Sequence, residues 1–262
     1  MEKRVEGKVA FITGGGSGIG KAAALLLARH GAKVCLLDRT PEQANKVKAE
    51  IESFGGEACV FETDISRPEM VEKGIRHVVD LWGKLDIVFA NAGINGKIAP
   101  IEEMTVEDWD QTIDINLRGT FLTVKYAIPH MKQKGGSIII TSSINGNRVF
   151  SNFGFSIYST SKAGQVAFMK MAALELAKFK IRVNAICPGA IETSIDDNTD
   201  YRPELDTIKI PVEFPEGDQP LQEGPGQPEH VADLVLFLAS DESSHITGTP
   251  IYIDGAESLL HG

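Results

Sequence analysis

The chain has 262 residues, of which 42% are hydrophobic and 24% are charged, the composition of an ordinary globular protein. Its formal net charge of −10 argues against nucleic acid or an anionic membrane as a partner, because both attract clustered positive charge. The N-terminal residues contain no apolar signal region, and the densest apolar run, residues 22–28, is too short to span a bilayer. We therefore expect a cytoplasmic protein.

Apolar, β-rich runs alternate with helical patterns along the whole sequence. Strands are predicted at 8–13, 34–37, 58–61, 85–90, 138–141, 182–186 and 249–253. Helices are predicted from residue 19 to a stop at Gly31, and at 41–54, 68–82, 107–132, 158–178 and 228–239. The strands are apolar on both faces, which indicates a parallel sheet covered by helices on both sides. The predicted fold class is therefore α/β.

Residues 194–227 differ from the rest of the chain, because they contain five prolines and little periodicity. The segment is too long for a simple connection, and loops of this kind are often lids over active sites. It shows no strong amphipathic pattern that would dock it on the domain. We expect one domain over residues 1–262, with 194–227 as a mobile lid over the substrate.

The cysteines and histidines do not indicate a metal site. Cys35, Cys59 and Cys187 form no CxxC pair, and the six histidines are scattered, without acidic or Cys neighbours at ligand spacing. Cys35 and Cys59 lie in apolar runs, which predicts buried thiols. Cys187 lies near the motifs described below, but a role for its thiol beside a cofactor is disfavoured.

A glycine-rich turn, Thr13-Gly14-Gly15-Gly16-Ser17-Gly18-Ile19-Gly20, joins the first strand to the first helix. Glycines allow the backbone to approach a pyrophosphate closely, and the helix N-terminus offers unpaired N–H groups and a positive dipole. Such a turn alone is also compatible with a plain connection. The strand before it and the helix after it favour a dinucleotide site, formed by Gly14, Gly16, Ser17, Gly18, Ile19 and Gly20.

An acidic residue, Asp38, ends the second strand 18 residues after Gly20. Its carboxylate would accept hydrogen bonds from the adenosine ribose hydroxyls and would repel a 2′-phosphate, which favours NAD over NADP. Arg39 argues the other way, because an arginine there can bind the 2′-phosphate. We give Asp38 more weight, since its position at the strand end directs it at the ribose. Whether Arg39 allows some use of NADP stays open.

Tyr158 and Lys162 stand four residues apart at the start of a predicted helix and therefore share one face. A phenol has an ordinary pKa of about 10, and a neighbouring ammonium group lowers it toward the working pH. Such a phenol can take a proton from an alcohol or give one to a carbonyl oxygen. The pair alone is equally compatible with an ordinary exposed Tyr and Lys. The fifth strand ends in Thr141-Ser142-Ser143, where a hydroxyl could hold the substrate oxygen against the tyrosine.

These motifs together resemble the short-chain dehydrogenase/reductase family, whose TGxxxGIG and YxxxK patterns stand here at residues 13–20 and 158–162. The resemblance covers nearly the whole chain. It implies a single doubly wound (Rossmann) domain with a parallel sheet of about seven strands, assembled into a homotetramer. It also implies that Ser143, Tyr158 and Lys162 are catalytic and that Lys162 binds the nicotinamide ribose. By the same resemblance, Asn116 holds a water that relays protons through the lysine; considered alone, it is simply a polar residue in a helix.

The serine stands farther from the tyrosine than is common in that family. Ser143 precedes Tyr158 by 15 residues, and Asn145 occupies the common position, two residues later. We interpret the difference as a longer loop, because the Thr-Ser-Ser end of the strand matches the family better than Asn145 does.

Three further segments resemble cofactor-binding segments of the family. Asn91-Ala92-Gly93 follows the fourth strand, with Ala90 in place of the family's first Asn. The family's adenine contact falls on Asp64, followed by Ile65, although Asp is equally favoured there as a turn or helix-capping residue. The segment 184–193 resembles the one that binds the nicotinamide carboxamide, which assigns to the cofactor Pro188, Gly189, Ile191 and Thr193.

The sequence thus predicts an NAD-dependent oxidoreductase that transfers a hydride between nicotinamide and a secondary alcohol or ketone. The preference for NAD favours oxidation of the alcohol as the direction. A 3-oxoacyl thioester reductase is the alternative, and an NAD-binding epimerase or lyase and a cofactor-sensing protein are the non-redox alternatives. The sensing protein is disfavoured, because the catalytic set is undamaged. We expect a small-molecule substrate, a homo-oligomer, and neither nucleic acid nor membrane as partner.

Charge around the predicted lid indicates the class of substrate. Residues 194–227 hold nine acidic residues against Arg202 and Lys209, a balance of −7, and a negative field disfavours the approach of anions. A solvated acidic loop that never meets the substrate is an equally weighted alternative. The loop before Tyr158 combines polar and aromatic residues that suit a neutral polyol, sugar or cyclic alcohol: Asn145, Asn147, Arg148, Phe150, Phe153 and Phe155.

Overall fold

The computed structural model describes residues 3–195, 199–210, 212, 214, 217–222 and 224–261. Within these residues a seven-stranded sheet forms the centre, with strand order β3-β2-β1-β4-β6-β7-β9. Its strands are β1 (Val9–Thr13), β2 (Lys33–Asp38), β3 (Glu57–Glu62), β4 (Ile87–Ala90), β6 (Gly136–Thr141), β7 (Ile181–Pro188) and β9 (Pro250–Ile253). Neighbouring strands of this sheet are all parallel. The predicted α/β class and doubly wound sheet are therefore confirmed.

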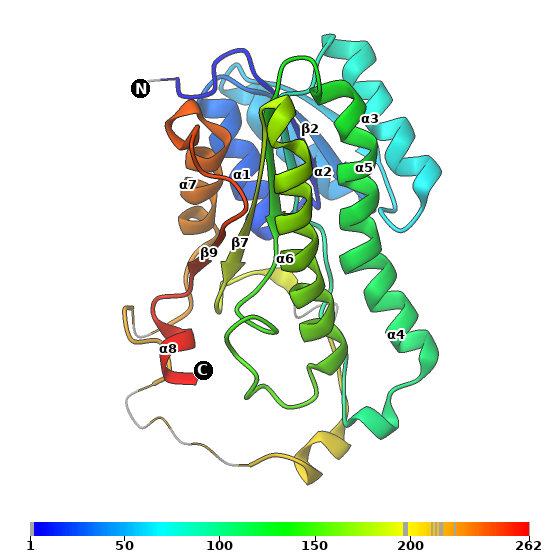
Figure 1. Ribbon diagram of the computed structural model, residues 1–262, viewed down its shortest axis with the longest axis vertical. Helices are drawn as coiled ribbons and strands as arrows, with labels where there is room; N and C mark the ends of the chain where they lie inside the picture. Colours follow the sequence, from blue (N-terminus) through cyan, green and yellow to red (C-terminus); the bar gives the residue numbers. More distant parts are fainter. Residues whose placement is uncertain are drawn as a thin grey trace.

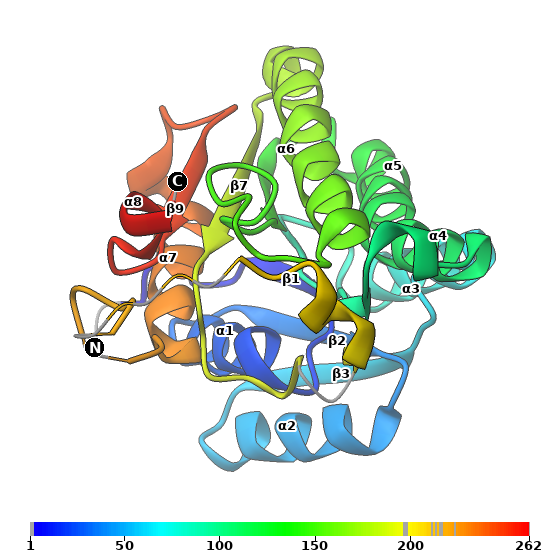
Figure 2. The same ribbon diagram turned by 90° about the horizontal axis from the view of Figure 1, so that it is seen from below.

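Helices join successive strands and cover both faces of the sheet (Figures 1 and 2). One face carries α3 (Pro68–Trp82), α5 (Gly119–Met131) and α6 (Ser156–Leu176). The other carries α1 (Gly18–Arg29), α2 (Pro41–Ser53) and α7 (Pro228–Ala239). The predicted bounds of α3 and α7 agree with the structure residue for residue, and the other predicted ends differ by one or two residues. In the described part of the chain, no helix is long and apolar enough to cross a membrane.

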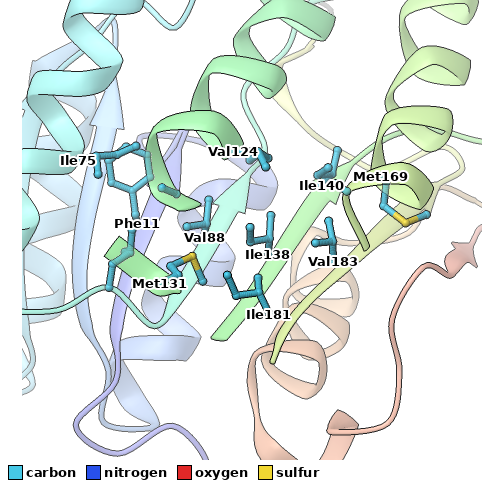
Figure 3. Packing of buried hydrophobic residues seen from close by; sticks show 14 of the residues in the cluster. Phe11, Ile75, Val88, Val124, Met131, Ile138, Ile140, Met169, Ile181 and Val183 are labelled. Carbon is cyan, nitrogen blue, oxygen red and sulfur yellow. The ribbon is translucent and has the colours of Figure 1, made fainter. Parts of the chain in front are cut away.

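An apolar layer lies on each side of the sheet. Phe11 and Val88 face α3, α5 and α6, whereas their sequence neighbours Ile12 and Phe89 face α1 and α7. Successive side chains of a strand point to opposite faces, so a strand that is apolar throughout supplies both layers. Figure 3 shows the first layer, with the labelled residues Phe11, Ile75, Val88, Val124, Met131, Ile138, Ile140, Met169, Ile181 and Val183.

The predicted helix 107–132 contains a π-helical turn. α4 (Val106–Ile113) passes into the π turn Asp114–Arg118, which continues directly as α5. In this turn the main-chain carbonyl of Asn116 accepts hydrogen bonds from two side chains, Thr120 Oγ1 at 2.7 Å and Gln165 Nε2 at 2.9 Å. A single π turn keeps the chain helical and barely disturbs the apolar periodicity, so the sequence pattern does not reveal it. Such turns are frequent at functional sites.

Part of the predicted lid is docked on the domain. β5 (Gly96–Ile98) and β8 (Thr199–Tyr201) form a parallel pair beside the main sheet. Leu205, in the 3₁₀ turn Pro203–Thr207, is only 6% exposed. The sequence shows no amphipathic pattern that would dock 194–227, yet this part is docked, because a three-residue strand and a single apolar anchor fall below what periodicity detects.

Two further described residues of that segment, Phe214 and Leu221, contact the C-terminal helix α8 (Glu257–His261) or the turn before it. The N–H of Leu221 donates to the carbonyl of Gly255 at 3.2 Å, and the ring of Phe214 lies 4.6 Å from that of His261. Five of the nine acidic residues counted there lie outside the described residues: Asp196, Asp197, Glu213, Glu216 and Glu223.

The two cysteines in the first strands differ in burial. Cys35 is buried as predicted, but Cys59 is only partly buried. The two are register partners on β2 and β3. Because β3 forms one edge of the sheet, its side chains are less completely covered, and the prediction of a buried thiol at Cys59 is wrong.

Candidate active site

A cavity of about 830 Å³ lies where the strands end, at the edge at which open α/β sheets bind ligands. Cofactor and small-molecule sites typically measure roughly 300–1,000 Å³. The glycine turn after β1, the segments after β2, β4, β6 and β7, and the start of α6 form its wall. Most residues predicted to contact the cofactor line it: Gly14, Ser17, Gly18, Ile19, Asp38, Arg39, Asp64, Ile65, Asn91, Ala92, Gly93, Tyr158, Lys162, Pro188, Gly189, Ile191 and Thr193.

The glycine turn fits a pyrophosphate. Gly14 and Gly18 have φ angles of +65° and +48°, which L side chains rarely adopt. A Cβ on Gly16 would lie 2.8 Å from Asp38 Oδ2, and one on Gly20 would overlap the carbonyl of Gly14. These two glycines do not line the cavity but shape the turn. The N-cap residue of α1 makes no side-chain capping bond, and its first turn holds no acidic residue, so the positive helix end is available to an anion.

Asp38 closes this turn from the end of β2. Its Oδ2 accepts from the Gly16 N–H and its Oδ1 from the Thr40 N–H, each at 2.9 Å. Both oxygens are thus fixed at the cavity wall, and each can accept a second hydrogen bond. The arrangement fits a ribose diol. Arg39 lines the same end of the cavity.

Hydrogen bonds connect the glycine turn to Lys162 across three strand ends. Thr13 Oγ1 accepts from the N–H groups of Asn91 and Ala92 at 2.9 Å and 3.1 Å. The side chain of Asn91 donates to Thr13 O at 3.2 Å and accepts from Thr141 Oγ1 at 3.0 Å. The carbonyl of Thr141 accepts from Lys162 Nζ at 3.0 Å. The ends of β1, β4 and β6 and the start of α6 therefore share one network.

Tyr158 and Lys162 are 7% and 3% exposed. Burial raises the pKa of Tyr158 to about 12, although a side-chain hydrogen bond with Ser143 lowers it. Burial also lowers the pKa of Lys162 to about 8. The expectation that the lysine lowers the pKa of the tyrosine is therefore wrong for the cofactor-free chain. Lys162 Nζ lies 5.4 Å from the centre of the phenol ring and donates to the Thr141 carbonyl, so the loss of solvent dominates.

The hydroxyl next to the phenol is that of Ser143. Its Oγ also accepts from the N–H of Asn145 at 3.1 Å. Asn147 fixes the loop that follows, since its Nδ2 donates to Ser142 Oγ at 3.1 Å and to Ser143 O at 2.8 Å. Ser143 is thus held through both its hydroxyl and its main-chain carbonyl.

Asn116 lies behind the cavity wall and is fully buried. Its Oδ1 accepts from the N–H of Ile94 at 2.9 Å, and its Nδ2 donates to Ile94 O at 2.9 Å and to Ser161 Oγ at 3.1 Å. A Cβ on Gly93 would lie 3.1 Å from Asn116 Oδ1 and 3.4 Å from Lys162 Nζ. The amide oxygen and the ammonium therefore both lie close to Gly93, beside the point where its Cβ would be.

Asp64 has the geometry of a turn residue and also faces the cavity. Its Oδ1 accepts from the N–H and Oγ of Ser66 at 3.0 Å and 2.6 Å, which is the turn role left open by the sequence. Both roles are compatible with one carboxylate.

At the opposite end of the cavity, the N–H of Ala190 donates to Glu257 Oε2 at 2.7 Å. This bond ties the segment 188–193 to α8.

The loop before Tyr158 contributes fewer residues to the cavity than predicted. Asn145 and Phe155 line it, but Asn147, Arg148, Phe150 and Phe153 do not. Asn147 is used within the loop, the guanidinium of Arg148 stacks 3.6 Å from the ring centre of Tyr252, and Phe150 is 76% exposed. A bridge between Asn145 and Val149 turns the loop back on itself, which carries these side chains away.

Other residues line the end of the cavity that would hold the substrate. Asn152 Nδ2 donates to Asn145 Oδ1 at 2.8 Å, and Asn95 Nδ2 donates to Thr199 Oγ1 at 2.9 Å. The cavity is further lined there by Tyr201 and Glu257. Asn145 is among the residues that the sequence singles out, whereas Asn95, Asn152, Tyr201 and Glu257 belong to no recognised motif. The proximity of Asn95 to Asn91-Ala92-Gly93 was the one available signal.

Cys187 lies beneath the site and is fully buried. Burial raises the pKa of its thiol to about 11, against a hydrogen bond with Ser142 that lowers it. The thiol is therefore protonated at neutral pH. Among the residues that the structure describes, no three His, Cys, Asp or Glu side chains gather as a metal site would require.

Known proteins match this chain along almost its whole length. The family described as Enoyl-(Acyl carrier protein) reductase matches residues 14–256. The chain is 40% identical over 253 residues to the 3-oxoacyl-[acyl-carrier-protein] reductase FabG of Thermotoga maritima, covering 96% of this chain and 98% of that protein. It is 38% identical over 257 residues to the cyclohexanol dehydrogenase of an Acinetobacter species, covering 98% and 97%.

Solved structures are equally similar. A 3-ketoacyl-ACP reductase from Sinorhizobium meliloti has 48% identity and a TM-score of 0.92, covering 96% of this chain and 99% of that one. A 3-ketoacyl-(acyl-carrier-protein) reductase from Brucella melitensis, complexed with NADH, has 32% identity and a TM-score of 0.85, covering 97% and 99%.

Proposed function

The chain belongs to the short-chain dehydrogenase/reductase family of oxidoreductases, and we propose that it transfers a hydride between NAD and a neutral secondary alcohol or ketone. The observation that carries the proposal is the position of Ser143, Tyr158 and Lys162 on the wall of the cavity that also contains the glycine turn. One cavity therefore has room for the dinucleotide and for the proton chemistry that must accompany hydride transfer.

The side chains divide the proton chemistry between them. Tyr158 exchanges a proton with the substrate oxygen, and Ser143 holds that oxygen against the phenol. Lys162, fixed by the Thr141 carbonyl at 3.0 Å, binds the nicotinamide ribose, and Asn116 supports a proton relay behind it. When bound, the nicotinamide supplies or accepts the hydride, and in its oxidised form it adds a positive charge that lowers the pKa of the neighbouring phenol.

NAD is favoured over NADP by the carboxylate at the ribose end. Asp38 is held by the N–H groups of Gly16 and Thr40, and a fixed negative charge there repels a 2′-phosphate. The Brucella reductase, whose structure contains NADH, is similar to this chain. The remaining cofactor-binding roles proposed from the sequence follow the same cavity wall.

Neutral substrates are favoured by the lining of the other end. Asn95, Asn145 and Asn152 offer amides, Tyr201 an aromatic ring, and Glu257 a carboxylate. Within the described part of the wall, the cationic side chains are Arg39 and Lys162, and the proposal assigns both to the cofactor. Amides with an aromatic face suit a polyol, a sugar or a cyclic alcohol, and the cyclohexanol dehydrogenase is a similar protein.

A 3-oxoacyl thioester reductase is the second candidate. It is supported by the names of relatives at 40% and 48% identity. Against it stands the carboxylate of Glu257 in the cavity, because an anionic carrier or coenzyme is attracted by positive rather than negative charge.

A substrate panel with both cofactors tests the proposal. Cyclic alcohols, polyols and sugars are compared with an acetoacetyl thioester and phosphorylated alcohols, with NAD(H) and NADP(H), by absorbance at 340 nm. We expect the highest kcat/KM for a neutral substrate with NAD. A thioester or phosphate ester as best substrate overturns the substrate class, and turnover without net change in NADH points to an epimerase or lyase.

The proposal extends to the assembly and to the segment over the cavity. We expect a cytoplasmic homotetramer acting on small molecules. Light scattering of the purified protein tests the tetramer. Residues 194–227 act as a lid that closes over bound cofactor and substrate. Their contacts with β5 and α8 would then be the closed or partly closed arrangement.

A further inference from the structure

Gln165 is a buried polar residue that the proposed mechanism does not use. It lies on α6 and is completely buried. It follows Tyr158 by seven residues and Lys162 by three, so it shares their face of the helix. Its Nε2 donates to the main-chain carbonyl of Asn116 at 2.9 Å and to Thr120 Oγ1 at 2.8 Å. Its Oε1 has no hydrogen-bond partner in the described part of the chain.

Stability alone does not account for this amide. A buried polar atom without a partner costs about 1–3 kcal/mol. Ser161 and Lys162, the nearest buried residues before it on the helix, are polar and belong to the proposed site, whereas Val166 and Met169 after it are buried and apolar. A methionine at position 165 would fill a similar volume without that cost. The role of the amide is therefore to be sought in the group that it holds.

That group is the main chain of the π turn. The Asn116 carbonyl accepts from both Gln165 Nε2 and Thr120 Oγ1. The side chain of Asn116 is held separately by Ile94 and by Ser161. Ser161 Oγ in turn donates to the carbonyl of Tyr158 at 2.7 Å.

We propose that Gln165 is a positioning residue that fixes the π turn against the catalytic turn of α6. Gln165 binds the main-chain carbonyl of Asn116. Ser161, one helical turn earlier on α6, binds the side chain of Asn116. The two contacts together set the position of Asn116 Oδ1 relative to Lys162 Nζ, and both atoms lie close to Gly93. The proposal rests on the catalytic roles proposed for Tyr158 and Lys162.

The substitution Gln165→Met removes the hydrogen bonds to the Asn116 carbonyl and to Thr120 and keeps the length of the side chain. We expect kcat to fall roughly tenfold, since small displacements of catalytic groups have effects of this order or larger. KM for the alcohol and Kd for NADH should change by less than about twofold, because neither binding surface is altered. The solvent deuterium isotope effect on the single-turnover rate should rise, because proton transfer becomes slower while hydride transfer is unchanged.

Met169→Leu is the matched control, since Met169 is equally buried on α6 but makes no hydrogen bond to the π turn. It should leave the rate and the isotope effect unchanged. Thr120→Val removes the other donor to the Asn116 carbonyl and should shift both quantities in the same direction as Gln165→Met. It gives the same readouts if Gln165→Met does not fold.

An unchanged isotope effect in these variants, whether kcat falls or not, would mean that the π turn is held only for stability and would overturn the proposal. Tyr158→Phe, measured in parallel, tests the proposed function separately. If that variant keeps its activity, the proposed chemistry fails whatever the Gln165 variants show.

Discussion

The two walls of the cavity are held in different ways. The cofactor wall, formed by residues 13–20, Asp38, Asn91, Thr141 and the start of α6, is joined by hydrogen bonds that connect three adjacent strand ends. The substrate wall is formed by Asn95, Asn145, Asn152, Tyr201 and Glu257. Of these, Tyr201 belongs to a three-residue strand and Glu257 to a five-residue helix, and Asn145 and Asn152 lie in the loop after β6. The proposed chemistry therefore rests on the sheet, whereas part of the proposed substrate contacts rests on short segments that can change without disturbing it.

The largest expected effect comes from the cofactor wall. Tyr158→Phe removes the proton donor and hardly changes the volume, so turnover should fall about 10²–10⁴-fold. NADH binding, followed by fluorescence titration, should persist. Tyr126→Phe is the control, because Tyr126 packs partly buried against the core. Substantial turnover by the Tyr158 variant would place the proton transfer elsewhere and break the assignment of chemistry to this wall.

Lys162→Met tests how strongly burial lowers the pKa of the lysine in the same wall. The folded chain releases the Lys162 proton near pH 8, whereas the unfolded chain keeps it to about 10.5. Between these values the unfolded state binds more protons, so the free energy of unfolding should rise with pH. The parent should gain roughly 3 kcal/mol relative to Lys162→Met over this window.

Urea unfolding of the cofactor-free proteins at pH 7.5, 9 and 10.5 measures that difference. Tyr158 is present in both proteins, so its own titration cancels in the comparison. Parallel stability curves would mean that the lysine is solvated in the free protein.

Asp38 is expected to decide the cofactor. Asp38→Ala loses charged hydrogen bonds to the ribose and should raise KM for NAD roughly tenfold to a hundredfold, while NADP becomes a usable cofactor with the help of Arg39. Asp38→Asn is the sharper variant, because its amide oxygen still serves one of the N–H groups of the turn while the charge is gone. Equal kcat/KM of the unaltered enzyme with NAD and NADP would contradict the role of Asp38.

On the substrate wall, Glu257→Gln separates charge from position. The glutamine keeps an oxygen for the Ala190 N–H but removes the negative charge, so kcat/KM for an anionic substrate should rise several-fold, roughly three- to tenfold, relative to a neutral one. NADH binding should not change. Glu257→Ala, which also loses the hydrogen bond, should weaken NADH binding. If Glu257→Gln leaves the ratio of kcat/KM for anionic and neutral substrates unchanged, α8 has no part in the choice of substrate.

The smallest effect concerns the attachment of the proposed lid. Asn95→Ala removes the hydrogen bond to Thr199, which at about 1 kcal/mol should speed hydrogen exchange of the β8 amides about fivefold. In the unaltered protein, exchange in 199–210 should slow when NADH and substrate are added. Full protection of these amides in the free protein would contradict a lid and would make the two walls equally rigid.

The same contrast explains what the sequence predicts well and what it does not. The sheet, its helices and the glycine turn follow from strong local signals. Apolar runs such as 138–141 indicate buried strands, and glycines such as Gly14 and Gly20 are required by the backbone of the turn. Asn95, Tyr201 and Glu257 line the same cavity only through tertiary packing of segments that are far apart in the sequence. The raised pKa of Tyr158 was also missed, because burial at the helix start is not visible in the spacing of Tyr158 and Lys162.

The network that joins the strand ends also bears on how the protein acquires activity. Thr13 and Asn91 are 78 residues apart in the chain, and Asn91 and Thr141 are 50 residues apart. Contacts between distant parts of a chain form slowly, because a long loop must close before they give any stabilisation. The site therefore has high contact order and cannot form in an early intermediate that has only local helices. During refolding, enzymatic activity should return with the phase in which β1, β4 and β6 pair, later than the helical signal.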